Sequence, residues 1–195
     1  MARPKQRTPE LRESVLAVAN DLLAREGAAG LTTRRVASAA ATSTPAVYEL
    51  FGDKAGLVRE LFFDGFRQLR RSLDEVGESD DPLADLVAIG ECYRDFIRAN
   101  PELAALMFSR PFTDFDPRPE EVNASGSVRT FLIERVQRCV DAGRLDGDVT
   151  DIAHLMVVLV QGLAAAENAN RLGTTRESID RRWRLGMDAL LRGLS

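Results

Sequence analysis

The sequence predicts an all-α protein of about nine helices, divided into a short N-terminal head and a longer C-terminal part. Three observations carry this expectation. Capping side chains followed by proline recur along the chain, apolar residues repeat at helical spacing, and no segment alternates apolar and polar residues as a strand does. The 195 residues are 45% hydrophobic and 29% charged, a composition typical of a compact globular chain.

Helix start and stop signals divide the chain into nine segments. Thr8-Pro9, Asp81-Pro82 and Asn100-Pro101 each place a capping residue before a proline, and Thr174 with Glu177 has capping-box spacing. Four apolar runs are followed by a glycine that suits a helix end, namely Gly27, Gly77, Gly143 and Gly173. The predicted helices span residues 9–26, 33–40, 44–51, 54–76, 82–98, 101–109, 119–142, 149–172 and 176–193.

Charge is unevenly distributed along the chain. The net charge is -4, yet four of the basic side chains fall within the first twelve residues and form a basic arm ahead of the first helix. No apolar leader follows Met1, and no charge-free apolar stretch reaches membrane-spanning length. We therefore expect a cytoplasmic chain with no membrane partner, in which Cys92 and Cys139 remain reduced, buried thiols.

The first three segments predict a helix-turn-helix unit. Leu11, Val15, Val18 and Leu22 form one apolar stripe on the first helix, which two short helices joined by Ala41-Thr42-Ser43 would cover. Val47 and Phe51 would face inward with Val36 and Leu22. In such a unit the second short helix enters the major groove of DNA. Its outward residues would be Thr44, Pro45, Ala46, Tyr48 and Glu49.

The candidate DNA contacts fall into phosphate and base contacts. Thr33 lies at a helix start and suits phosphate, whereas Arg34 and Arg35 suit phosphate or guanine. Ser43, Thr44, Pro45, Ala46 and Glu49 are left to read bases, because the segment 44–51 has no Arg, Lys, Asn or Gln. Three alternatives stay open: Tyr48 as a packing residue, Arg35 paired with an acid, and Ser43 or Thr44 as a cap alone.

The segment GLTTRRVASAAATSTPAVYELFGDKAGL resembles the DNA-binding segment of the tetracycline-repressor (TetR) family of bacterial transcriptional regulators. The resemblance covers residues 8–60 and implies a DNA-binding domain over 1–53 and an effector-binding and dimerisation domain over 54–195. The family often has glycine where Ala41 stands, and His-Tyr or Asn-His where Glu49-Leu50 stand. YRDFIRANPELAALMF and VQGLAAA are similar to a C-terminal domain type with a Trp-His-Gly signature, which here reads Val160-Gln161-Gly162. The resemblance also implies that Lys54 and Tyr48 contact the DNA backbone, because they match family positions that do so. The implied function is a ligand-responsive repressor that binds a palindromic operator.

Two C-terminal helices predict a homodimer. The segment 149–172 is apolar almost all round, so it needs burial on several sides, and the last segment carries a matching stripe. A four-helix interface with two helices from each subunit would follow. The predicted interface residues are Leu155, Leu159, Gly162, Ile179, Trp183 and Leu190. The alternative is that both helices complete the core of a single chain.

Aromatic and methionine side chains crowd the helices around the fourth segment. They predict an apolar effector pocket lined by Phe62, Phe66, Tyr93, Phe96, Met107, Phe108 and Phe112. The alternative is plain core packing. The preferred ligand class is a hydrophobic small molecule.

No enzyme, metal site or cofactor is expected. His154 is the one histidine, it lies on the most apolar segment, and it has no carboxylate or cysteine pattern beside it. We interpret it as an interior or interface residue. The second class of function is a helical ligand-binding or adaptor protein that no longer binds an operator.

Overall fold

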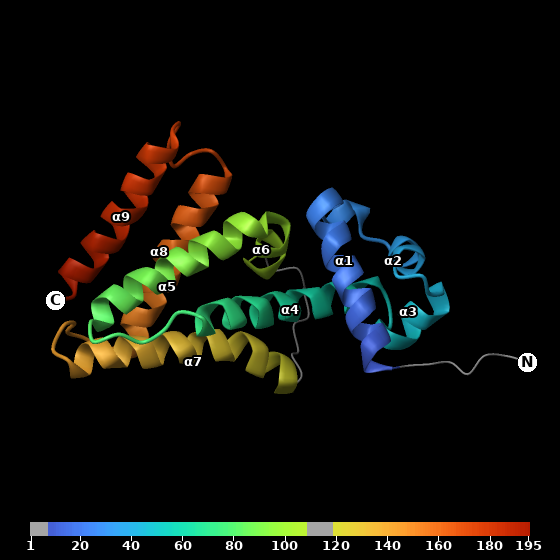
Figure 1. Ribbon diagram of the computed structural model, residues 1–195, viewed down its shortest axis with the longest axis horizontal. Helices are drawn as coiled ribbons and strands as arrows, with labels where there is room; N and C mark the ends of the chain where they lie inside the picture. Colours follow the sequence, from blue (N-terminus) through green and yellow to red (C-terminus); the bar gives the residue numbers. More distant parts are fainter. Residues whose placement is uncertain (1–7, 109–118) are drawn as a thin grey trace, which may run out of the picture. The chain divides into compact units, whose positions relative to one another are not determined.

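The computed structural model describes residues 8–108 and 119–195, in which nine helices and no strand occur (Figure 1). The helices are α1 (Pro9–Gly30), α2 (Thr33–Ala39), α3 (Thr44–Phe51), α4 (Lys54–Asp74), α5 (Pro82–Ala99), α6 (Pro101–Phe108), α7 (Pro119–Asp141), α8 (Val149–Asn168) and α9 (Arg176–Gly193). The predicted all-α class is confirmed. Each helix begins at its predicted residue, because the capping side chains and prolines mark helix starts strongly.

Helix ends follow the prediction less closely than helix starts. The helical backbone of α1 breaks at Gly27, whose φ is +66°, and then resumes as far as Gly30. The predicted end of α8 at residue 172 is wrong, because the helix stops at Asn168 and Asn170 adopts a φ of +55°. A positive φ is also found at Gly143, but Gly77 and Gly173 are not among the described residues with positive φ.

The capping box before α9 lies one residue later than predicted. Ser178 N donates to Thr175 Oγ1 at 3.2 Å, and Thr175 N donates to Ser178 Oγ at 3.3 Å. Thr174 and Glu177 were therefore the wrong pair. Serine performs the return bond that a glutamate usually makes at this position.

The described chain divides into two compact units. Residues 8–66 and 100–108 form the first, and residues 67–99 and 119–195 form the second. Thus α1, α2, α3, α6 and the first part of α4 build one unit, while α5, α7, α8, α9 and the end of α4 build the other. The boundary falls within α4, after Phe66.

In the first unit, α1 contacts α2 and α6 through a buried face that contains Val15, Leu16, Ala19 and Leu23. The predicted stripe was only partly right, since Leu11, Val18 and Leu22 are half-buried. The predicted stripe counted large apolar residues only and therefore left out Ala19, which is fully buried. The centre of the buried face of α1 is thus one residue beyond Val18. Arg12 Nη2 donates to Glu60 Oε2 at 2.6 Å, which ties α1 to α4.

The second unit is a bundle in which α5 contacts α7, α8 and α9, and α8 contacts α7 and α9 (Figure 1). Its interior includes Leu86, Val136, Ile152, Met156 and Trp183. Cys139 is buried on α7, and desolvation raises its pKa to about 11, so the thiol form dominates at neutral pH. Cys92 is half-buried, and its Sγ donates to the carbonyl oxygen of Ser72.

The described residues include one helix that is long and apolar enough to cross a membrane, α8, whose mean hydropathy is 1.7. Only 28% of its most apolar window is buried in the single chain. Length and composition are a weak indication, because a core helix of a soluble protein meets the same criteria. The low burial shows that one side of α8 is not covered by the other residues that the structure describes.

Candidate nucleic-acid interface

The turn between α2 and α3 is short and hydrogen-bonded. Thr32 caps α2 by accepting from Arg35 N at 3.3 Å, and in the turn Thr42 N donates to the Ala37 carbonyl oxygen at 2.9 Å. Ala41 has a φ of +50°, a left-handed conformation that a side chain disfavours. A glycine at position 41 would adopt this backbone without that cost.

Helix α3 separates an inward face from an outward face. Val47 and Phe51 are buried at 0% and 9% exposure, whereas Tyr48 is 48% exposed. Pro45 and Glu49 are exposed, and Thr44 and Ala46 are half-buried. The division into faces is as predicted. Ser43 Oγ accepts from Ala46 N at 3.3 Å, so this hydroxyl caps α3 and has one acceptor site already in use.

A tight corner sets the start of α4 against the end of α3. Gly52 ends α3 with a φ of +80°, and Asp53 Oδ1 accepts from Gly56 N at 2.7 Å to begin α4. A Cβ on Gly56 would lie 1.8 Å from the Phe51 carbonyl oxygen, so only glycine permits this approach. Lys54 is consequently held, exposed, at the first position of α4 directly after α3.

The two neighbouring arginines of α2 differ in their surroundings. The Arg35 guanidinium forms a two-pronged ion pair with Glu26 and also donates to the Gly30 carbonyl oxygen at 3.4 Å. The hydrogen bond with Glu26 raises the pKa of Arg35. Arg34 is exposed and has no polar partner among the described residues. Arg35 therefore links α2 to α1, the alternative left open from sequence, and Arg34 remains available to a ligand.

Thr33, the first residue of α2, is half-buried, and the neighbouring Thr32 does the capping. The basic arm of residues 1–7 lies outside the described residues. The DNA-contact roles of Thr33, Arg34, Tyr48 and Lys54 stay predictions. The ion pair of Arg35 could have been anticipated from Glu26, which lies nine residues earlier at the end of the preceding helix.

The predicted effector residues are distributed over both units. Phe62, Phe66, Met107 and Phe108 belong to the first unit, in which Phe66 meets Phe62 and Phe108 edge to face with ring centroids 5.2 and 6.3 Å apart. Tyr93 and Phe96 are buried in the second unit, where desolvation raises the pKa of Tyr93. Phe112 lies outside the described residues. The effector pocket stays a prediction.

The predicted dimer residues divide into exposed and buried groups. Leu155 and Gly162 are exposed on α8, and Leu159, Ile179 and Leu190 are half-buried. Trp183 is only 4% exposed in the single chain, where its Nε1 donates to Glu167 Oε2 at 2.6 Å. Trp183 is thus an interior residue of the single chain, and its predicted role in a dimer interface stays a prediction. The predicted interface residues did not include Val158 and Leu185, which at 66% and 65% are the most exposed large apolar side chains among the described residues.

His154 is exposed on α8, and its Nδ1 lies 2.8 Å from the Thr150 carbonyl oxygen. It is thus not an interior residue of the single chain, which corrects half of the interpretation from sequence. No group of three potential metal ligands occurs among residues 8–108 and 119–195.

Two family models match this chain. Residues 15–61 match the model of bacterial regulatory proteins of the tetR family, and residues 86–190 match that of the tetracyclin repressor-like C-terminal domain. The second match covers more than half of the chain. The Trp-His-Gly subtype stays a prediction.

Individual proteins agree with the family models. The HTH-type transcriptional regulator Rv1816 of Mycobacterium tuberculosis (strain ATCC 25618 / H37Rv) is 24% identical over 72% of this chain and 60% of its own length. A protein of unknown function from Rhodococcus sp. RHA1 has a TM-score of 0.83 and 26% identity, with 99% of each chain covered. FadR from Bacillus subtilis, solved in complex with stearoyl-CoA, has a TM-score of 0.74 at 13% identity and covers 94% of this chain and 99% of its own.

The N-terminal match includes most of α1 and all of α2, α3 and the α3–α4 corner, and the C-terminal match extends from α5 into α9. The curated relatives align with this chain over only 60% of their length. With both parts of the domain pattern present in one chain, the protein belongs to the TetR family of bacterial regulatory proteins.

Proposed function

We propose that this protein is a sequence-specific DNA-binding transcriptional regulator, most simply a ligand-responsive repressor that binds a palindromic operator as a homodimer. The observation that carries the proposal is the two-faced α3. Val47 and Phe51 hold the helix to its unit, and Pro45, Tyr48 and Glu49 are presented to solvent. A helix of eight residues is marginal in isolation, so its presentation on a packed support suits a helix that inserts into a groove.

Phosphate contacts would surround this helix. Lys54 is exposed at the start of α4, Thr33 opens α2, and the positive end of each helix dipole favours an anion there. Arg34 is the guanidinium of α2 that has no partner within the described residues. Arg35 is committed to Glu26, so we assign it a structural role in the DNA-binding unit.

Base contacts would come from small groups. Thr44 offers a hydroxyl, and Pro45 and Ala46 offer apolar surface that suits the methyl group of thymine. The absence of long amide or basic side chains from α3 implies that phosphate contacts supply much of the affinity, and that the salt dependence of binding is steep.

The dimer would form through α8 and α9. Leu155, Val158 and Leu185 are exposed apolar side chains on these helices, and within the described part of the chain no atom lies within 4 Å of where a Cβ on Gly162 would be. Such a surface is costly in a monomer and typical of an interface between subunits. Two copies would present two α3 helices to two half-sites, which is what a palindrome requires. We keep 1–53 as the DNA-binding domain and 54–195 as the effector-binding and dimerisation domain.

The effector would be a hydrophobic small molecule. The support is the group of edge-to-face phenylalanines in the first unit, in which Phe108 remains 36% exposed. Helix α4 belongs to both units, so a ligand that shifts it would change the spacing of the two α3 helices. Allosteric coupling of this kind typically weakens operator binding by about 5- to 150-fold.

The test is a fluorescence-anisotropy titration of DNA from upstream of the protein's own gene. We expect saturable binding that Val158→Glu weakens by preventing dimer formation, while Ala84→Glu, an exposed position on α5, leaves it unchanged. Sedimentation velocity on the same variants reports the oligomeric state. Absence of sequence-selective binding by an intact dimer would favour the second candidate, a helical ligand-binding or adaptor protein.

A further inference from the structure

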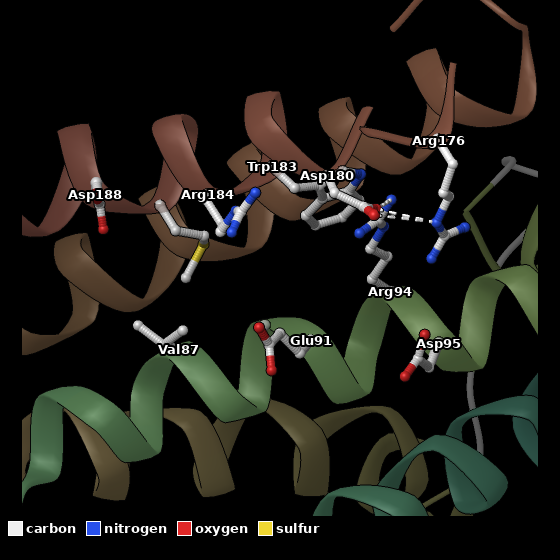
Figure 2. A pocket seen from close by; sticks show the side chains of 11 residues that line it. Val87, Glu91, Arg94, Asp95, Arg176, Asp180, Trp183, Arg184 and Asp188 are labelled. Atoms are coloured by element: carbon white, nitrogen blue, oxygen red, sulfur yellow. Dashed lines mark hydrogen bonds and ion pairs between the residues drawn. The ribbon is translucent and has the colours of Figure 1, made fainter. Parts of the chain in front are cut away.

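A groove of about 380 Å³ runs between α5 and α9 within the second unit (Figure 2). Val87, Gly90 and Met187 supply its apolar part, with Met187 5% exposed and packed against Gly90, where a Cβ would lie only 3.0 Å from Met187 Cε. The rim carries charged side chains of both signs: Glu91, Arg94, Asp95, Arg176, Asp180, Arg184 and Asp188. A hollow with an apolar floor and a charged rim suits a small ligand that has an apolar body and charged ends.

Most of the rim charges are already neutralised by neighbours. Arg94 Nη2 and Arg176 Nε lie 2.8 and 3.1 Å from Asp180 Oδ1. Asp95 pairs with Arg98 at 3.2 Å, and Asp188 pairs with Arg192 at 3.3 Å, each along its own helix. A ligand would have to break these pairs to use these groups, so they define the walls of the groove rather than its recognition chemistry.

Two rim charges are left over, one of each sign. Glu91 on α5 and Arg184 on α9 are exposed, and neither has a polar partner among the described residues. Figure 2 shows Glu91 on the α5 side of the groove and Arg184 on the α9 side. They form no ion pair with each other, although they line the same groove. A molecule with two opposite charges would satisfy both groups without breaking a pair.

We propose that this groove binds a small bipolar molecule of the amino-acid type, with its ammonium group at Glu91, its carboxylate at Arg184 and its apolar chain over Met187. A simple anion would gain Arg184 but meet Glu91, and a simple cation would gain Glu91 but meet Arg184. Both charged ends and the apolar chain therefore contribute to affinity. The site is separate from the predicted aromatic effector residues and does not depend on DNA binding.

The chain contains its own reporter for this groove. Trp183 is the only tryptophan in the sequence, it lines the groove, and the Arg94 guanidinium carbon lies 5.0 Å from the ring centroid. Ligand charges placed beside this ring change its electrostatic environment. Selective excitation of Trp183 fluorescence therefore reports whether a ligand occupies this groove.

The experiment uses the full-length protein without DNA, and its probes are ω-amino acids from glycine to 8-aminooctanoate, which scan the separation of the two charges. Hexanoate and hexylamine are the probes with a single charge. We expect a saturable Trp183 fluorescence change and a matching heat of binding for one range of chain lengths, with a dissociation constant on the order of 1 mM, because each exposed ion pair contributes little. The two single-charge probes should bind about fivefold more weakly, because each lacks one of the two exposed ion pairs.

Glu91→Gln and Arg184→Gln should each weaken binding of the best ω-amino acid about fivefold. Glu177→Gln and Arg181→Gln are the matched controls, because both residues are exposed on α9 and neither lines the groove. The proposal is overturned if no ω-amino acid gives a saturable signal or heat up to about 20 mM, a concentration far above the expected dissociation constant of about 1 mM. Equal binding of hexanoate or hexylamine, or unchanged binding in both groove variants, would also overturn it.

Discussion

The guanidinium of Arg94 donates two hydrogen bonds to the carboxylate of Glu167, from Nε to Oε2 at 2.8 Å and from Nη2 to Oε1 at 3.0 Å. Each side chain is only 10% exposed. The pair joins α5 to α8 across 73 positions of sequence, and the Trp183 indole of α9 adds a third helix through its own hydrogen bond to Glu167. A buried pair with this geometry sets the register of three helices, whatever its net effect on stability.

Removal of Arg94 alone should therefore lower the free energy of unfolding more than removal of both charges does. We expect Arg94→Met to lower the free energy of unfolding by about 3–5 kcal/mol, because it leaves the Glu167 carboxylate buried without its main partner. The double variant Arg94→Met/Glu167→Gln should recover more than half of that loss, since the amide still accepts from Trp183 and carries no charge. Urea denaturation of the three proteins measures both values. A double variant no more stable than Arg94→Met would contradict this account of the pair.

The pair of Arg94 and Glu167 also predicts that the protein loses stability at acidic pH. Burial by itself would raise the pKa of Glu167, but hydrogen bonds from Arg94 and Trp183 outweigh it and place the pKa below its ordinary value. For Asp180, the hydrogen bond from Arg94 lowers the pKa. A lowered folded-state pKa gives stability that is present above the ordinary carboxyl pKa of about 4 and is lost as pH falls through the folded value.

The melting temperature of the wild type should accordingly fall as the pH is lowered from about 5 to 3. The curve of Arg94→Met/Glu167→Gln should be flatter over the same interval, because Glu167 no longer titrates and Asp180 keeps Arg176 but has lost Arg94. Thermal melts in buffers of matched ionic strength supply the comparison. Parallel curves for the two proteins would show that other carboxylates carry the acid sensitivity.

Ala41 should be replaceable by glycine with a gain in stability. A left-handed conformation costs a residue with a side chain about 1–2 kcal/mol, whereas glycine loses about 0.4–1 kcal/mol through the greater freedom of the unfolded chain. Ala41→Gly should thus raise the free energy of unfolding by up to about 1 kcal/mol. Ala40→Gly is the matched control, because Ala40 has a φ of -83° and should lose stability instead. Equal effects at the two positions would exclude backbone strain at Ala41.

Arg34 and Arg35 should separate DNA binding from folding. Arg34→Ala removes an exposed guanidinium that has no partner among the described residues, so we expect an unchanged melting temperature, weaker DNA binding and a shallower dependence of affinity on salt. Arg35→Ala removes the ion pair with Glu26 and should lower the melting temperature. Anisotropy titrations at several salt concentrations and thermal melts on both variants decide the assignment. The reverse pattern would mean that Arg35 leaves Glu26 to contact DNA.

Helix starts and the DNA-binding unit were predictable from sequence because their signals are local. A capping side chain beside a proline or a hydroxyl residue predicts a helix start, as at Asp81-Pro82 and Ser43-Thr44. The buried side of α3 is predicted by the four-residue spacing of Val47 and Phe51. The positive φ of Ala41 has no such signal in a single sequence, since alanine is typical of regular helix.

The long-range relationships had no local signal. Arg94 and Glu167 are in contact only because α5 and α8 pack together. The two residues are 73 positions apart, so no spacing within one helix predicts the pair. Periodicity marks Trp183 as part of an apolar stripe but does not distinguish the interior of one chain from an interface between two. The groove of Glu91 and Arg184 likewise depends on the packing of α5 against α9, which no residue pattern predicted.

The central claim, that two copies of this chain place two α3 helices on DNA, is tested most directly by selection from a pool of random duplexes. The wild-type protein should enrich a palindrome whose two half-sites are spaced by about one helical turn of DNA or a multiple of it. Enrichment of no sequence by a folded, dimeric protein would contradict the claim, and so would enrichment of a single half-site.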